Sequence, residues 1–237
     1  MIALSYQGHP AVTKAAFVAE MEAHLAADRI RRGQYWTEGT GCAIGCGVQS
    51  IMNLKGIVGM AHSNHGLHAA ALGIPKWLSE VQDMLFEGMR GPHQQSFPIE
   101  FARALPDGAD LSGLHAAWMS WILREIDLPI AVGHAVAYVA IERVAAGIET
   151  NWATDNKFAA SFAAKAITSS LTGGVDQAVR YATWAASRAV DVDARDALWA
   201  TTDAVYAACG NAPYIAVWTK IADKLLTLMA ACPVVAA

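Results

Sequence analysis

Helical periodicity runs through nearly the whole chain, and no segment alternates β-branched with polar residues as a half-buried strand would. Glycine and proline interrupt the pattern, for example at Gly73-Ile74-Pro75 and at Gly210-Asn211-Ala212-Pro213. We therefore expect an all-α fold, a single-domain assembly of about nine or ten helices with no sheet. Within it, residues 1–92 form the motif-bearing helices, 93–128 a loop-rich connection and helix, and 129–237 an alanine-rich helical support.

The breaks also bound the individual helices. The first is expected from Pro10 to Gly33 and the second from Gly41 towards Gly59, and a later helix contains Trp77 to Phe86. Prolines and an Asp107-Gly108 turn make 93–113 the loosest stretch, with one short helix at Ile99–Leu105. In the second half the expected helices span 129–149, 152–170, 174–190, 193–209 and 213–231.

Aromatic residues recur among the alanines of the second half, at Tyr181, Trp184, Trp199 and Tyr206. Small residues with one aromatic ring every turn or two allow two helices to approach closely while the ring fills the gap. We interpret these aromatic side chains as core residues rather than as a cofactor site.

Composition argues against several functions. A net charge of −4 and a pI near 6.0 disfavour a nucleic-acid partner, which needs clustered lysine and arginine. Apolar residues reach 54%, but the best candidate for a membrane span, 129–148, contains His134, Glu142 and Arg143. The first ten residues lack the features of a secretion signal, and the four cysteines show no disulfide pattern. We expect a cytoplasmic protein with no membrane partner; its substrate and oligomeric state stay open.

Half of the cysteines and three of the eight histidines are close in sequence, as Cys42, Cys46, His62, His65 and His68. Cys42 follows a glycine-broken turn where a helix is expected to begin, and the unpaired N–H groups of a helix start favour a thiolate. A helix start alone lowers a thiol pKa too little for catalysis, so a histidine base is required. The leading hypothesis is a small-molecule enzyme with Cys42 as nucleophile, His65 or alternatively His62 as base, and Asp83 or alternatively Glu87 orienting the ring.

Two further hypotheses fit the same residues. Cys42 and Cys46 are four positions apart, so on one helix both sulfurs would face the same side and could bind one ion. The metal set is then Cys42, Cys46, His62 and His65, and the cofactor is zinc or another transition metal. Alternatively, Cys42 is a small buried residue whose flanking glycines permit close helix packing, in a non-catalytic binding or scaffold module.

A polar pocket is expected in the N-terminal third, against the alanine-rich support, and a small molecule is its expected ligand. The carboxylates of Asp83 and Glu87 reach this pocket if their helix face turns inward to the cysteine helix. The candidate binding residues are Tyr35, Trp36, Glu38 and Glu87.

The first third also carries a longer pattern, which begins with Tyr35-Trp36 and Gly39-Thr40-Gly41-Cys42-Ala43-Ile44-Gly45-Cys46. A histidine follows, and then Gly73-Ile74-Pro75-Lys76-Trp77-Leu78 and Asp83-Met84-Leu85-Phe86-Glu87-Gly88. In this pattern, and in its alanine-, tryptophan- and arginine-rich C-terminal half, the chain resembles a group of bacterial and phage proteins of unknown function. The resemblance implies an all-helical fold and carries no known activity. The stretch Val48–Ala61 is longer than in that group, and position before Gly-Ile-Pro favours His65 as the matching histidine.

Overall fold

The computed structural model describes residues 4–150, 154–171, 177–189 and 194–235. The predicted all-α fold is confirmed, because these residues form helices, one short π-helical segment (η1) and isolated backbone bridges but no strand. The elements are α1 (Lys14–Ala26), α2 (Ala43–Lys55), α3 (His65–Leu72), α4 (Lys76–Gly88), α5 (Pro92–Ala104), α6 (Leu114–Ile122), η1 (Leu123–Asp127), α7 (Leu128–Ile130), α8 (Ala135–Glu149), α9 (Thr154–Ser170), α10 (Gln177–Ala189), α11 (Ala194–Cys209) and α12 (Asn211–Ala230).

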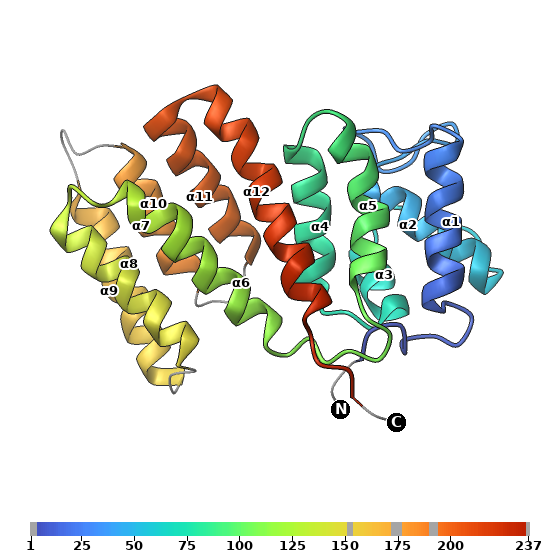
Figure 1. Ribbon diagram of the computed structural model, residues 1–237, viewed down its shortest axis with the longest axis horizontal. Coiled ribbons are helices and arrows are strands. Elements are labelled where there is room, and N and C mark those ends of the chain that lie inside the picture. The colour runs from blue at the N-terminus through green and yellow to red at the C-terminus, as the bar shows by residue number, and fades with distance from the viewer. Residues whose placement is uncertain (1–3, 151–153, 172–176, 190–193, 236–237) are drawn as a thin grey trace. The chain divides into compact units, whose positions relative to one another are not determined.

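The helices gather into two compact units, whose elements can be followed by their labels in Figure 1. Unit 1 comprises residues 1–113 and 222–237, and unit 2 comprises residues 114–221. The chain therefore leaves unit 1 after α5 and returns to it within α12. The boundary between the two units at residues 113 and 114 lies inside 93–128, the segment that was expected to form a loop-rich connection and helix.

Unit 1 has a core of large apolar side chains, and α1 packs along both α5 and α2 in it. The Thr13 hydroxyl caps α1 by accepting the Ala16 N–H. The prediction that this helix continues to Gly33 is wrong, since α1 ends at Ala26. Asp28 has a φ of 51°, and this left-handed conformation cannot continue a right-handed helix.

Residues 27–42 fold back over the N-terminus of α2. The carbonyl oxygen of Tyr35 lies so close to the helix that a Cβ atom added to Gly41 or Gly45 would be 2.1 or 1.3 Å from it. The Cys42 N–H donates to the Gln34 carbonyl at 2.8 Å in the same contact. These two glycines therefore have a packing role, because any larger residue would push the loop off the helix.

The segment 93–113 is more helical than predicted: a helix is present where 99–105 was expected to form one, but it begins earlier, at Pro92. α5 begins with Pro92, in the first-turn position that proline favours, and continues through Pro98. An internal proline removes one backbone hydrogen bond and costs about 3 kcal/mol. Phe97 and Phe101 are fully buried in unit 1, and the burial of these rings offsets that cost.

Unit 2 consists of alanine-rich helices whose small buried side chains allow close packing. The bounds of α9 to α12 lie close to those predicted. The interpretation of the aromatic residues as core is wrong for Trp184, Trp199 and Tyr206, which expose 38, 46 and 56% of their surface. Buried alanines surround these positions in the sequence, so the helices pack through alanine and leave the three rings at the surface.

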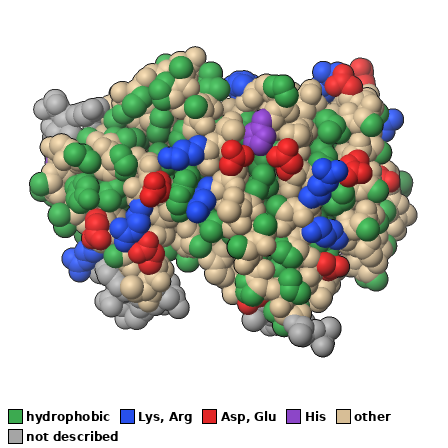
Figure 2. Space-filling model, in the orientation of Figure 1, with side chains coloured by type: hydrophobic (Ala, Val, Ile, Leu, Met, Phe, Trp, Pro, Cys, Tyr) green, Lys and Arg blue, Asp and Glu red, His purple; other side chains and the backbone are tan. Residues whose placement is uncertain are grey.

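The surface carries side chains of both charges. On the face in view in Figure 2, lysine and arginine side chains are interspersed with aspartate and glutamate. Among the described residues, no helix has both the length and the apolar composition that crossing a bilayer requires.

We predict that Gly45→Ala destabilises the protein by about 3 kcal/mol, because the new Cβ would lie 1.3 Å from the Tyr35 carbonyl oxygen. Urea unfolding followed by circular dichroism measures the change. Gly113→Ala is the control, since no heavy atom lies within 4 Å of its added Cβ. Equal stability of the two variants would contradict the packing role of Gly45.

Candidate functional site

Cys42 is the N-cap residue of α2, at the helix start that the glycine-broken turn predicts. Its sulfur accepts a hydrogen bond from the Gly45 N–H at 3.4 Å and donates one to Asp83 Oδ1 at 3.2 Å. The side chain is buried, with 2% of its surface exposed. The thiol of Cys42 is thus held between the start of α2 and the side of α4.

Asp83 and Glu87 lie one turn apart on α4, and both carboxylates approach Cys42. One oxygen of each carboxylate and the Cys42 sulfur all lie within 4.8 Å of one another. Glu87 also accepts the Gly33 N–H at 3.1 Å and pairs with Arg32 at 3.4 Å. A cavity of about 220 Å³ lies beside these carboxylates, and it is lined by Gly33, Gln34, Tyr35, Cys42, Asp83 and Glu87.

His65, the first residue of α3, approaches the second oxygen of Asp83. Its Nε2 lies 3.6 Å from Asp83 Oδ2 and 3.5 Å from the Tyr35 hydroxyl. The three predicted catalytic residues therefore come together, but the carboxylate of Asp83 lies between the sulfur of Cys42 and the imidazole of His65. In a cysteine–histidine–aspartate triad the imidazole takes the middle position.

A hydrogen-bonded chain continues from His65 into the core of unit 1. Ser79 Oγ lies 3.3 Å from His65 Nδ1 and 3.0 Å from His68 Nδ1. A hydroxyl donates a single proton, so one of these nitrogens accepts and the other donates. His65 Nε2 faces Asp83 Oδ2 and the hydroxyl oxygen of Tyr35, whose own proton is directed to Asp83, so we infer that this nitrogen carries the ring proton. We infer that His68 Nδ1–H donates to Ser79, that Ser79 donates to His65, and that His65 donates towards Asp83.

His68 ends this chain in an apolar environment. The residue is fully buried, and its Nε2 has no hydrogen-bond partner in the part of the chain that the structure describes. The ring packs edge-on against Phe17 and fills space beside Gly47, where an added Cβ would be 2.8 Å from it. Burial lowers the pKa of His68 to about 3, and the charge of His65 contributes less. His68 is therefore neutral at pH 7.

Burial also dominates the electrostatics of the cavity. Burial first, and then the negative charge of Asp83, raises the pKa of the Cys42 thiol well above its ordinary range. The same two causes, with a hydrogen bond to Asp83, raise the pKa of Tyr35 to about 12. Cys42 and Tyr35 are both protonated at neutral pH, and Asp83 is the acceptor on which these groups converge.

Two residues of the predicted metal set lie apart from this cavity. Cys46 is fully buried, and its thiol donates to the Gly41 carbonyl at 3.4 Å. His62 Nε2 lies 3.0 Å from the Gln49 side-chain oxygen. Among the described residues, the one group of three or more side chains whose ligand atoms could share an ion is Cys42, Asp83 and Glu87. The predicted set of Cys42, Cys46, His62 and His65 is thus not assembled.

Two predicted binding residues also lie outside the cavity lining. Trp36 stacks on His62 with ring centroids 5.2 Å apart and meets His24 edge-on. Glu38 is exposed in the tight turn between Thr37 and Thr40. Tyr35 and Glu87 are the predicted binding residues that line the cavity.

Sequence reasoning missed Ser79 and the backbone of Gly33. Ser79, Asp83 and Glu87 recur every four residues, and this spacing alone puts them on one face of a helix. Gly33 contributes only a backbone N–H, for which side-chain patterns carry no signal.

Comparisons of the chain with protein-family models, with curated proteins and with solved structures give no match. Its function is therefore inferred from the geometry around Cys42, Asp83 and Glu87.

We predict that the His68 imidazole stays neutral, protonated on Nδ1, from pH 7.5 down to about pH 5, because burial lowers its pKa to about 3. Two-dimensional ¹⁵N–¹H NMR of the imidazole rings reports the tautomer and the titration. Ser79→Ala, which removes the shared hydroxyl, should change the tautomer balance of His65. A His68 resonance that titrates with a midpoint near its ordinary value of about 6.5 would contradict the inferred chain.

Proposed function

We propose that unit 1 binds one transition-metal ion, zinc by ligand preference, through Cys42, Asp83 and Glu87. The observation that carries this proposal is the convergence of one sulfur and two carboxylate oxygens within 4.8 Å at the wall of a cavity. These three side chains come from two elements, the start of α2 and one face of α4. Neither element has to unfold for the ligand atoms to meet at one ion.

The chemistry of the donors favours zinc over magnesium or calcium. Magnesium and calcium take oxygen ligands, whereas zinc accepts cysteine sulfur together with carboxylate oxygen. Three protein ligands leave a fourth position, which is the arrangement of zinc sites that bind a small molecule or water. The 220 Å³ cavity gives such a ligand access to Cys42, Asp83 and Glu87. The chemistry that zinc would supply there is that of a Lewis acid.

His65 and Ser79 fit the role of supporting residues for this site. Metal-bound carboxylates are commonly hydrogen-bonded through the oxygen or edge that the metal does not use. Here Asp83 Oδ1 contacts Cys42, while Asp83 Oδ2 faces His65 at 3.6 Å. The chain from His68 through Ser79 to His65 then fixes the orientation of the Asp83 carboxylate.

A bound cation would also relieve the electrostatic cost of the cluster. A buried thiol beside two carboxylates resists ionisation, because burial and the negative charge of Asp83 both oppose the thiolate form of Cys42. Zinc binds thiolate, so its binding must displace the Cys42 proton. The affinity is therefore expected to fall as the pH is lowered. All four cysteines are free, which is compatible with the cytoplasm as the proposed location.

We predict that protein purified without an affinity tag and stripped with EDTA binds one Zn²⁺ or Co²⁺ ion per chain. Co²⁺ should show thiolate-to-metal charge-transfer absorption, because Cys42 supplies a sulfur ligand. Cys42→Ser and Glu87→Gln should each weaken Zn²⁺ binding by about 100-fold, since loss of even a supporting residue costs about 10–100-fold. Isothermal titration calorimetry with a competing chelator measures the affinity.

Cys209→Ser and Glu38→Gln are the matched controls, because both residues are exposed and lie outside the cavity lining. Their Zn²⁺ affinity should equal that of the unmodified protein. The metal proposal fails if the stripped protein takes up no Zn²⁺, or if Cys42→Ser binds it as tightly as Cys209→Ser does.

A cysteine nucleophile is the second candidate, and the contact of Asp83 with both Cys42 and His65 is the observation that favours it. In this reaction class Cys42 attacks a small electrophilic substrate, and its proton passes to Asp83, which already accepts the hydrogen bond of the thiol. The raised pKa of Cys42 opposes this role, because the thiolate is the nucleophile.

For the metal-free protein we predict that iodoacetamide modifies Cys42 at least about tenfold more slowly than Cys209 at pH 7.5. The reason is that each unit by which a thiol pKa is raised lowers its thiolate fraction about tenfold, and Cys209 is exposed. Mass spectrometry of the labelled peptides gives both rates. If the alkylation rate of Cys42 instead rises with pH about a midpoint below about 7.5, and this midpoint is higher in His65→Ala, the result would favour Cys42 as a nucleophile.

A further inference from the structure

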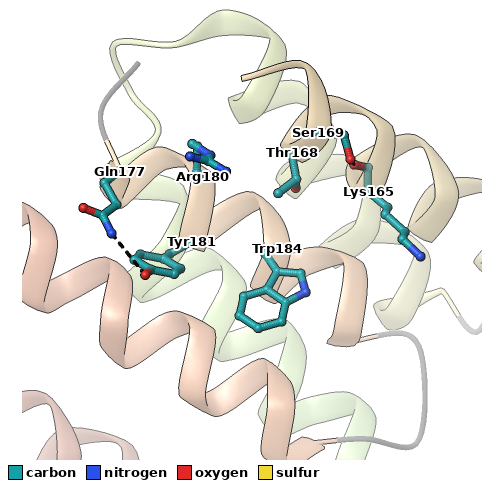
Figure 3. Close-up of a pocket in the computed structure, with 7 residues that line it drawn as sticks. All are labelled: Lys165, Thr168, Ser169, Gln177, Arg180, Tyr181 and Trp184. Atoms are coloured by element: carbon teal, nitrogen blue, oxygen red, sulfur yellow. Dashed lines mark hydrogen bonds between the residues drawn. The ribbon is translucent and has the colours of Figure 1, made fainter. Parts of the chain in front are cut away.

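Unit 2 contains a cavity of its own, between α9 and α10 (Figure 3). Its volume is about 340 Å³, within the range of roughly 300–1,000 Å³ that small-molecule sites occupy. α10 contributes Gln177, Arg180, Tyr181 and Trp184, and α9 contributes Lys165 with the two hydroxyl residues Thr168 and Ser169.

The described residues that line this cavity carry a net positive charge. Lys165 and Arg180 are its ionised side chains among the described lining residues, and no aspartate or glutamate is among those residues. Neither Lys165 nor Arg180 forms an ion pair with a described residue. Elsewhere in unit 2, by contrast, Arg124 pairs with Glu149 at 2.6 Å and Arg188 with Asp196 at 2.5 Å. The two cations of the cavity are thus available to an anion.

The aromatic side chains of the cavity are positioned on one stripe of α10. Tyr181 and Trp184 lie three residues apart, and Trp184 exposes 38% of its surface instead of packing into the core. Gln177 Nε2 donates to the Tyr181 hydroxyl oxygen at 3.1 Å, which fixes the phenol and leaves its O–H as a donor (Figure 3). A large indole exposed at a cavity wall provides a flat surface on which a second ring can stack.

We propose that this cavity binds a small organic anion that carries a flat aromatic ring. Arg180 lies four residues before Trp184, so its guanidinium and the indole belong to the same face of α10. The guanidinium binds a phosphate or carboxylate group through paired N–H donors, with Lys165 as a second cation from α9. Tyr181 and Trp184 contact the ring, and the Tyr181 hydroxyl donates to the anion or to a polar atom of the ring. This site is separate from the metal site proposed for unit 1.

Phosphate and carboxylate share the chemistry that Arg180 recognises, so the test uses a probe of each kind. Isothermal titration calorimetry of the full chain should detect saturable binding of adenosine 5′-monophosphate or of indole-3-acetate at concentrations up to about 1 mM. Adenosine, which lacks the anion, and inorganic phosphate, which lacks the ring, should each bind at least about tenfold more weakly than adenosine 5′-monophosphate.

Arg180→Gln should weaken the binding of the better probe by about tenfold, and Trp184→Ala by about fivefold or more. Arg195→Gln and Trp199→Ala are matched controls, because both residues are exposed on α11 and do not line the cavity. Circular dichroism confirms that all four variants are folded. The proposal is overturned if neither probe binds, or if Arg180→Gln and Trp184→Ala bind it as tightly as their controls.

Discussion

The candidate site of unit 1 depends on one close contact, that of the Tyr35 carbonyl with the glycines at the start of α2. Without Cβ atoms at Gly41 and Gly45, the loop 27–42 can lie directly on the helix. That contact brings the backbone of Gly33 and the ring of Tyr35 to the cavity that Cys42 also lines. A side chain at either glycine would therefore change the cavity wall as well as the packing, so stability and site geometry are coupled in this segment.

The candidate site also requires that α4, a largely buried helix, has one polar face. α4 turns Leu78, Val81 and Leu85 into the core and presents Ser79, Asp83 and Glu87 at intervals of four residues. Buried polar groups are costly unless they are paired, and here each has a partner from another element. Ser79 contacts two histidines of α3, Asp83 contacts Cys42, and Glu87 contacts the loop. The polar network therefore holds α2, α3 and α4 together while it builds the cavity.

Local sequence periodicity predicted the helices well but predicted poorly which way individual side chains point. The helix holding Trp77 to Phe86 and the bounds of α9 to α12 follow from spacing and breaks, whereas α5 does not, because burial of phenylalanine outweighs the internal proline. The prediction that the sulfurs of Cys42 and Cys46 face the same side of one helix is wrong for a geometric reason. Cys42 is an N-cap with extended backbone, φ −69° and ψ −177°, so the rule that residues four apart share a face does not apply to it. The contact of Asp83 with Cys42 joins residues 41 positions apart and needed the tertiary structure.

Net charge is a poor guide to the ligands of this chain. The value of −4 predicts that the chain has no nucleic-acid partner, yet the described linings of the two cavities carry charges of opposite sign. Asp83 and Glu87 make the cavity of unit 1 suited to a cation, while Lys165 and Arg180 make that of unit 2 suited to an anion. Coulomb interactions at contact distance outweigh those of distant surface charges, which salt screens beyond about 10 Å. The sign of the ligand that we propose for each cavity therefore follows from the few charges that line it, and the net charge of the chain has little influence on either proposal.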